Sequence, residues 1–247
     1  MAPLISEELG RCVWKSVAAW CSRFRPSGTE TVLHRFKFPD LSLPVKLRRR
    51  DGAHPLSGLV SDAQGNLYGA TELGGLHNEG TIFKISPDGR ETLIYAFRGK
   101  PDGFAPYGTL TLDAQGNLYG TAYAGGAYDY GTIFKLSPER KLQVLYTFTD
   151  NADGAHPAAG VVFDAQGNLY GTTSFGGHYW GTIFRLSPAG VLTTLYTFQG
   201  QVDGATPLSP LIFDSEGNLY GTTSEGGNFG TPCTRSYGCG TVFKVTP

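Results

Sequence analysis

The stretch Gly65–Gly69 reads GNLYG, and the same five letters recur from Gly116, Gly167 and Gly217, at intervals of 51, 51 and 50 residues. Neighbouring letters recur with it: DAQ or DSE precede it, a Gly-Gly pair follows, and then comes GTIF or GTVF. A fixed period of about 50 residues is typical of propeller blades, in which each repeat forms one small sheet. The repeat therefore decides the fold class before any single element is considered.

Each complete unit contains four strand candidates, which in the second unit span residues 106–112, 117–122, 131–137 and 142–148. DAQGN carries the Asp, Gly and Asn that a tight hairpin turn needs. Leu and Tyr of NLYG are adjacent and point to opposite faces of a strand, as do Ile and Phe of GTIF. A sheet that is apolar on both faces fits a blade packed between two others. We expect units that start near 55, 106, 157 and 207.

The two ends of the chain predict a closed ring. ETVLHRF (30–36) matches ETLIYAF (91–97), whereas the last unit has three strand candidates before Pro247. We therefore expect the N-terminal strand to complete the last blade. The prediction is an all-β fold: a β-propeller of four four-stranded blades over residues 30–247, with 37–50 as an insertion loop.

Residues 1–29 are predicted to form a short amphipathic helix or a tail. Apolar residues recur there at helical spacing: Ile5, Leu9, Cys12, Val13, Val17, Trp20 and Phe24. On such a helix Cys12 and Cys21 would face opposite ways and could not bridge. The alternative is a helix that binds a membrane surface or a partner.

Composition excludes several classes of function. The net charge is −1 and charged residues make up 17%, so no global field favours nucleic acid. No run of about 18 apolar residues predicts a transmembrane helix, and residues 1–24 lack the basic start and apolar run of a signal peptide. We expect a monomer. Cys233 and Cys239 flank a short loop, CTRSYGC, and could form a disulfide if the protein is exported.

The repeat resembles the GloVer (Gloeobacter and Verrucomicrobia) tandem repeat over residues 30–247. The segments that carry the resemblance are GNLYGTTSFGG, GTIFRLSP, LTTLYTF and DGATP. The resemblance implies a propeller that is secreted or at the cell surface, with no assigned activity. The DxxGNLYG strand pair is also similar to blades of NHL and SMP-30-like propellers, some of which are enzymes. No metal-ligand set of that enzyme class is recognisable in this sequence.

The loops between the second and third strands differ in every unit: residues 76–79, 127–130, 178–180 and 228–239. Binding usually lies on such variable loops, and exposed aromatic rings suit sugars or proteins. We predict a non-enzymatic binding or scaffold propeller for a protein or carbohydrate; alternatively, these rings only cover the blade tops. The candidate ligand-binding residues are Tyr128, Tyr130, His178, Tyr179, Trp180, Phe229 and Tyr237.

No cofactor and no catalytic residue is predicted, but one metal site is considered. The crossings between units carry Asp51, Asp102, Asp153 and Asp203, which could ring the channel mouth and hold Ca²⁺. The competing interpretation is that each Asp caps its own turn. The histidines on the same face, His54, His77, His156 and His178, show no local spacing of metal ligands. The alternative function is a metal-assisted hydrolase or lyase at the channel mouth.

Overall fold

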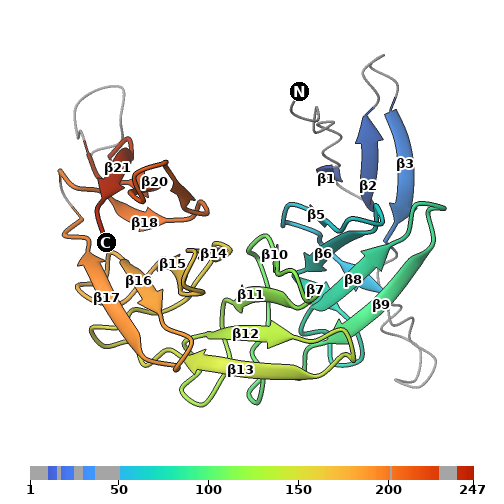
Figure 1. Ribbon diagram of the computed structural model, residues 1–247, viewed down its shortest axis with the longest axis horizontal. Helices are drawn as coiled ribbons and strands as arrows, with labels where there is room; N and C mark the ends of the chain where they lie inside the picture. Colours follow the sequence, from blue (N-terminus) through green and yellow to red (C-terminus); the bar gives the residue numbers. More distant parts are fainter. Residues whose placement is uncertain (1–10, 16–17, 25–29, 37–50, 201, 228–237) are drawn as a thin grey trace.

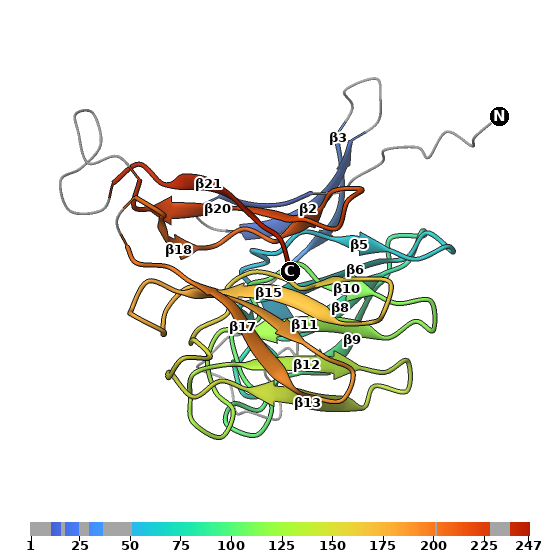
Figure 2. The ribbon, with the colours of Figure 1, turned by 60° about the vertical axis from the view of Figure 1, so that its left-hand side comes forward.

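The structure is a computed structural model that describes residues 11–15, 18–24, 30–36, 51–200, 202–227 and 238–247. Every helix or strand in these residues is a β-strand, which confirms the all-β prediction. The sheets follow one another along an arc (Figure 1), and Figure 2 shows the same succession from a second direction. We call the strands of a blade A to D in chain order.

Three four-stranded antiparallel sheets form the middle of the arc. Blade 1 contains β5 (Val60–Ser61), β6 (Leu67–Thr71), β8 (Thr81–Ile85) and β9 (Glu91–Ala96), with β4 (Gly52–Ala53) paired to β7 (Leu73–Gly74). Blade 2 contains β10 (Thr111–Leu112), β11 (Leu118–Ala122), β12 (Thr132–Leu136) and β13 (Leu142–Thr147). Blade 3 contains β14 (Val162–Phe163), β15 (Leu169–Thr173), β16 (Thr182–Leu186) and β17 (Leu192–Thr197).

Partial sheets lie at the two ends of the arc. The last sheet contains β18 (Ala205–Pro207), β19 (Ile212–Phe213), β20 (Leu219–Glu225) and β21 (Thr241–Val245), in which β19, β20 and β21 are strands A, B and C. The N-terminal sheet contains β1 (Arg11–Lys15), β2 (Ala18–Phe24) and β3 (Glu30–Arg35).

The predicted N-terminal helix is wrong, because residues 11–15 and 18–24 are the two antiparallel strands of a β-hairpin, β1 and β2, and β2 pairs with β3. The β2–β3 register, with an irregularity after Cys21, matches that of β8 and β9, which shifts after Ile82. The three strands therefore occupy positions B, C and D of a divergent blade. The hairpin register also places Cys12 opposite Cys21, so the helical argument that separated them does not apply. Valine and aromatic residues favour strands, and apolar spacing alone selected the wrong element.

The predicted pairing of residues 30–36 with the last blade is not found. β3 pairs with β2, and among the described residues β21 pairs with β20 alone. Residues 18–24 form the strand beside β3. The prediction had placed the C strand of the last unit there instead. The insertion loop expected at 37–50 lies outside the described residues.

A phenylalanine contact joins each blade to the next. The C-strand Phe packs edge-to-face on the Phe that follows strand D of the preceding sheet, with ring centroids 4.9–5.4 Å apart. The pairs are Phe36–Phe83, Phe97–Phe134, Phe148–Phe184 and Phe198–Phe243. The same ring covers the last Gly of GNLYG, where an added Cβ would lie 2.4–2.8 Å from the ring tip. That glycine is required because the ring occupies the space of a side chain.

One carboxylate closes each A–B hairpin. Asp164 Oδ1 accepts the backbone N–H groups of Gln166 and Asn168 at 2.9 and 2.8 Å. Its Oδ2 accepts Asn168 Nδ2 at 2.6 Å and the Tyr170 hydroxyl at 3.0 Å. The same set recurs at the other three hairpins, around Asp62, Asp113 and Asp214. We call this arrangement the Asp clamp; it confirms that these aspartates make the turns.

Hydrogen bonding lowers the pKa of the clamp carboxyls. Partial burial raises the pKa of Asp62, Asp113 and Asp164, but hydrogen bonds from the Asn side chain, the backbone and the Tyr outweigh it and leave the pKa below its ordinary value. At Asp214 the hydrogen bond from Asn218 is the largest cause, and the pKa falls to about 2.

The first prediction concerns the Asp clamp. Asp164→Ala should lower the free energy of unfolding by about 2 kcal/mol, since hydrogen bonds to a charged group contribute about 1.5–3 kcal/mol each and do not add fully. Gln166→Ala keeps its backbone N–H and should cost less than about 0.5 kcal/mol. Urea denaturation of both variants checks this, and equal losses would show that the clamp is not a stabilising contact.

The second prediction concerns the loss of stability at acidic pH. A folded pKa below the unfolded one means that the stabilisation is complete above the unfolded pKa, about 4, and is lost as the pH falls through the folded pKa. The urea midpoint should therefore fall between about pH 4 and pH 2, and Asp164→Asn should reduce that dependence. A midpoint that stays constant down to pH 2 would contradict this account.

Candidate functional site

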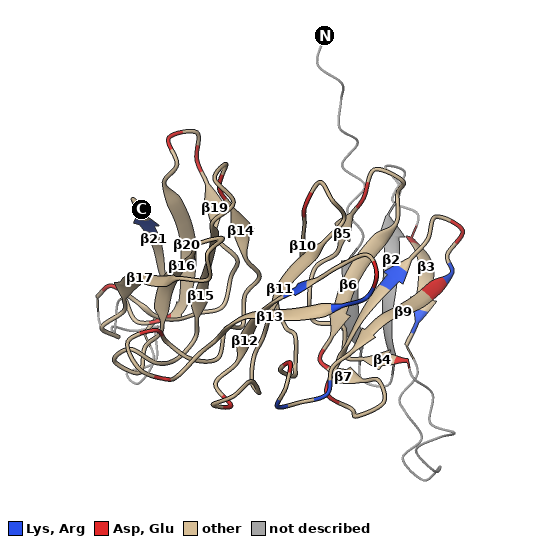
Figure 3. Cartoon of the chain, turned by 60° about the horizontal axis from the view of Figure 1, so that its bottom comes forward, with Lys and Arg blue, Asp and Glu red and all other residues tan. Residues whose placement is uncertain are grey.

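Antiparallel order places the A–B and C–D turns at one end of each blade, and the B–C loops with the D–A crossings at the other. Charged residues gather mainly at these turns, while the strands are mostly uncharged (Figure 3). The A–B end carries the same clamp four times. The B–C end, which we call the variable face, carries different residues in each copy and is the candidate site.

Exposed aromatic side chains lie on the variable face of blades 2 and 3. Tyr128 is 61% exposed, Tyr179 84%, Phe175 44% and Trp180 38%. His178 is also exposed. We call these five residues the aromatic patch. Four of them, all except Phe175, were predicted from the sequence, and the fifth was missed because Phe175 follows strand B rather than lying between the glycines.

Two features fix the blade 3 loop that carries Tyr179 and Trp180. Trp180 packs across Gly200, where an added Cβ would lie 2.3 Å from the indole ring, so one face of the ring is covered. Tyr179 has a positive φ of 75°. The residues at the same place in the loops of blades 1 and 2, Asn78 and Asp129, also have positive φ angles, of 63° and 72°. Asn and Asp tolerate this conformation, whereas a tyrosine there is strained. The strain is therefore particular to the blade 3 loop.

A cluster of rings lies next to the patch. His156 stacks on Tyr123 with ring centroids 4.7 Å apart and contacts Tyr130 and Phe175 edge-on, both at 5.9 Å. His156 Nδ1 is 3.0 Å from the Tyr123 carbonyl oxygen. Tyr130, a predicted ligand-binding residue, is half-buried and joins the blade 2–3 core instead of standing free.

A polar group continues this cluster toward blade 1. Glu72 Oε2 is 3.2 Å from His54 Nδ1, and its Oε1 accepts the Tyr107 hydroxyl at 3.2 Å. Tyr107 in turn packs on Tyr123 with centroids 5.0 Å apart. Burial, followed by the charge of Glu72, raises the pKa of Tyr107 to about 12. Glu72 and Tyr107 were missed, because only the fold brings them beside His54.

The crossing aspartates are engaged by their own turns. Asp102 is 1% exposed and its Oδ2 accepts the Tyr95 hydroxyl and Arg98 Nε. Asp153 accepts the Tyr146 hydroxyl at 3.1 Å and the Thr149 N–H at 2.9 Å. Asp203 accepts the Tyr196 hydroxyl and the Gln199 N–H, both at 2.9 Å. Burial and then the Asp102 hydrogen bond raise the pKa of Tyr95 to about 12.

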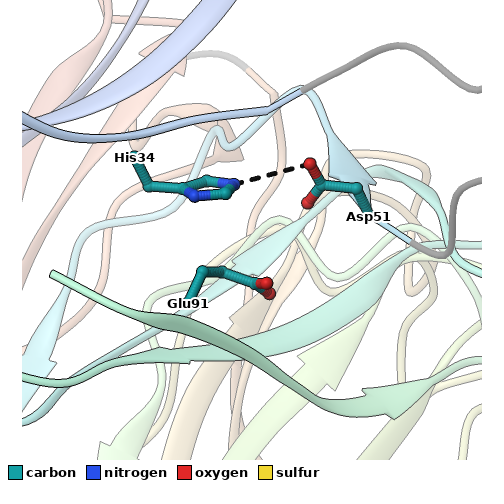
Figure 4. A group of neighbouring side chains, drawn as sticks. All are labelled: His34, Asp51 and Glu91. Atoms are coloured by element: carbon teal, nitrogen blue, oxygen red, sulfur yellow. Dashed lines mark ion pairs between the residues drawn. The ribbon is translucent and has the colours of Figure 1, made fainter.

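Asp51 has different neighbours. Its Oδ1 accepts the Gly52 N–H at 2.9 Å, while its Oδ2 lies 3.4 Å from His34 Nε2. Glu91 points at the same pair from β9 (Figure 4). Burial, followed by the charge of Asp51, raises the pKa of Glu91. Of the described residues, only these three form a group of His, Asp, Glu or Cys with ligand atoms within 4.8 Å of one another, so the four histidines of the variable face do not converge.

The remaining predicted residues fall in the last B–C loop. Phe229, Tyr237 and Cys233 lie outside the described residues. Cys239 is disulfide-bonded.

A groove of about 1080 Å³ lies at the opposite end, between the turns of blades 1 and 2. Its lining includes Asp62, Lys84, Arg90, Asp113 and Arg140. The clamp residues in this lining recur in every blade as parts of the turns. We therefore attribute the groove to the wedge between adjacent blades and not to a specific site.

Solved structures of similar fold include three enzymes. A streptogramin B lyase has 18% identity and a TM-score of 0.52, covering 87% of this chain and 61% of the lyase. A luciferin-regenerating enzyme has 15% identity and a TM-score of 0.54, and the match covers 97% of this chain and 76% of that enzyme. A gluconolactonase from Xanthomonas campestris has 13% identity and a TM-score of 0.53, and the match covers 93% of this chain and 68% of the gluconolactonase. Identities this low show the propeller-like fold alone, and the chain spans about three fifths of the lyase.

No curated protein matches this chain in sequence. None of the described residues forms a helix that could span a membrane. The profile of the Gloeobacter/Verrucomicrobia repeat matches residues 22–234. The repeated clamp, the Phe-on-Gly contact and this match agree, and the chain belongs to the Gloeobacter/Verrucomicrobia repeat family.

Proposed function

We propose that the protein is a non-enzymatic binding module whose aromatic patch holds a carbohydrate. The observation that carries this proposal is the exposure of Tyr128, Phe175, Tyr179 and Trp180 on loops that differ between copies. The clamp end of each blade is, by contrast, chemically the same. A fold that needed these rings for packing would bury them.

The patch suits the apolar face of a sugar ring. Aromatic side chains offer a large flat surface, and Tyr adds a hydroxyl that can hydrogen-bond. Because Gly200 already fixes one face of Trp180, little side-chain entropy is lost when a ligand covers the other face. Tyr179, which is 84% exposed, presents a second ring on the same loop. His178, next to it in the chain, supplies a polar group. A protein surface is the competing ligand.

The metal-assisted hydrolase or lyase at the channel mouth has less support. Asp102, Asp153 and Asp203 each accept a Tyr hydroxyl. The last two also accept a backbone N–H of their own turn. These bonds direct at least one oxygen of each carboxylate toward its own turn, and none of the three aspartates belongs to a group of possible metal ligands among the described residues. If the enzyme hypothesis held, Asp153→Asn would abolish turnover, whereas the binding proposal expects unchanged ligand affinity.

The third prediction tests the patch. Trp180→Ala and Tyr179→Ala should each weaken carbohydrate binding at least tenfold, because aromatic anchors dominate such interfaces. A glycan array identifies the oligosaccharide, and calorimetry with it measures the affinity. Val191→Ala is the matched control, since Val191 is a 62% exposed apolar side chain at a C–D turn. Full affinity in both patch variants, or binding to no glycan, contradicts the proposal.

The fourth prediction separates packing from binding. His156 has φ 55°, and Ala105 holds the equivalent place in the preceding crossing with φ 54°, so His156→Ala should keep the backbone. The lost ring contacts should cost about 1–2 kcal/mol of unfolding free energy, measured by urea denaturation. Glycan affinity should change less than threefold, since His156 lies next to the patch and not in it. A tenfold loss would extend the site to the ring cluster.

A further inference from the structure

The contact between neighbouring D strands follows one pattern in the middle of the arc. At the interface of blades 1 and 2, Tyr95 bonds to Asp102, and Leu142 joins the same apolar cluster. At the interface of blades 2 and 3, Tyr146 bonds to Asp153, and Leu192 joins the cluster. Each interface thus combines a Tyr, an Asp and a Leu.

The first interface departs from this pattern at two of its three positions. In the alignment of ETVLHRF with ETLIYAF, His34 replaces the Tyr. Glu91, the first residue of its D strand, replaces the Leu at 142 and 192. Asp51 keeps the Asp position. These two differences between copies, far apart in the chain, place an imidazole and a second carboxylate beside Asp51.

The three side chains face one another across the interface of the N-terminal sheet and blade 1. His34 comes from β3, Glu91 from β9 and Asp51 from the crossing between them (Figure 4). The ring of His34 is positioned by Phe36, with centroids 4.7 Å apart. One ligand atom of each residue lies within 4.8 Å of the other two.

Two buried atoms of this group lack a hydrogen-bond partner. The Nε2 atom of His34 and the Oε1 atom of Glu91 are both inaccessible to solvent and have no hydrogen-bond partner among the described residues. The 3.4 Å contact of His34 Nε2 with Asp51 is an ion-pair distance, longer than a well-formed hydrogen bond.

We propose that His34, Asp51 and Glu91 form a binding site for a divalent first-row metal ion of the Zn²⁺ type. One imidazole and two carboxylates suit such an ion, and three protein ligands leave one position for water. Tetrahedral bonds of about 2.0–2.1 Å place ligand atoms about 3.3 Å apart. The 3.4 Å between His34 Nε2 and Asp51 Oδ2 matches this spacing. The ion would supply the bonding partner that these two buried atoms lack.

The site would fasten the N-terminal sheet to blade 1. That sheet has three strands within the part of the chain that the structure describes, and it makes the first Phe contact of the arc through Phe36 and Phe83. A metal that takes ligands from β3 and β9 ties the two sheets together. This role is independent of the aromatic patch, which lies on blades 2 and 3.

The test uses the untagged full chain after dialysis against a chelator, with Zn²⁺ as the probe. Calorimetry should give one ion per chain with a Kd of micromolar or below, and the ion should raise the Tm. The variant H34Y/E91L restores the Tyr and Leu of the other interfaces and so should keep the fold. It should bind Zn²⁺ at least a hundredfold more weakly, and Zn²⁺ should leave its Tm unchanged. H77Y, at an exposed loop histidine, is the control and should behave as the parent.

Two results overturn the proposal. One is a parent chain that takes up no stoichiometric Zn²⁺, Mn²⁺, Co²⁺ or Ni²⁺, which would leave a His–carboxylate ion pair only. The other is an H34Y/E91L variant that keeps the parental Kd, which would place the ion elsewhere. E91Q covers the case in which the double variant fails to fold, because it keeps the size of Glu91 and should still lose most of the affinity.

Discussion

The fold depends on a phenylalanine ring that lies on a glycine. In each of blades 1, 2 and 3 and in the last sheet, the C-strand Phe occupies the space that a Cβ of the neighbouring B-strand Gly would need, and it contacts the preceding sheet edge-to-face. One ring thus packs inside its own blade and against the preceding sheet. This contact sets the spacing of the sheets, and it explains why the last letter of GNLYG cannot change.

The Asp clamp and the Phe contact together leave other positions free to vary. The clamp closes the A–B end of every hairpin, and the rings fill the faces between blades. Neither constrains the B–C loops, where the aromatic patch has formed. Nor do they constrain the first and fifth residues of strand D, where Glu91 stands in place of Leu and His34 in place of Tyr. Function is proposed where the copies differ because the shared contacts already hold the fold.

The sequence was informative where the physics is local and repeated. The recurrence of GNLYG gives the period of the repeat. Neighbouring residues within one repeat give the strand positions, the burial of both sheet faces and the turn aspartates. The N-terminal sheet was not predicted, because β1 and β2 share the strand register of the other blades but lack the Gly and Phe of their B and C strands. The His34–Glu91 pair was also missed. Aligning ETVLHRF with ETLIYAF shows that His34 departs from the repeat, but only the order of the sheets reveals that Glu91 faces it.

The most direct test of this account is a double-mutant cycle on blade 3. An added Cβ at Gly171 would lie 2.6 Å from Phe184 Cζ, so Gly171→Ala should lower the unfolding free energy by about 2–3 kcal/mol. In a Phe184→Leu background, where the ring tip is gone, the same change should cost less than about 1 kcal/mol. If Gly171→Ala costs the same in both backgrounds, the ring-on-glycine contact is not what the fold depends on.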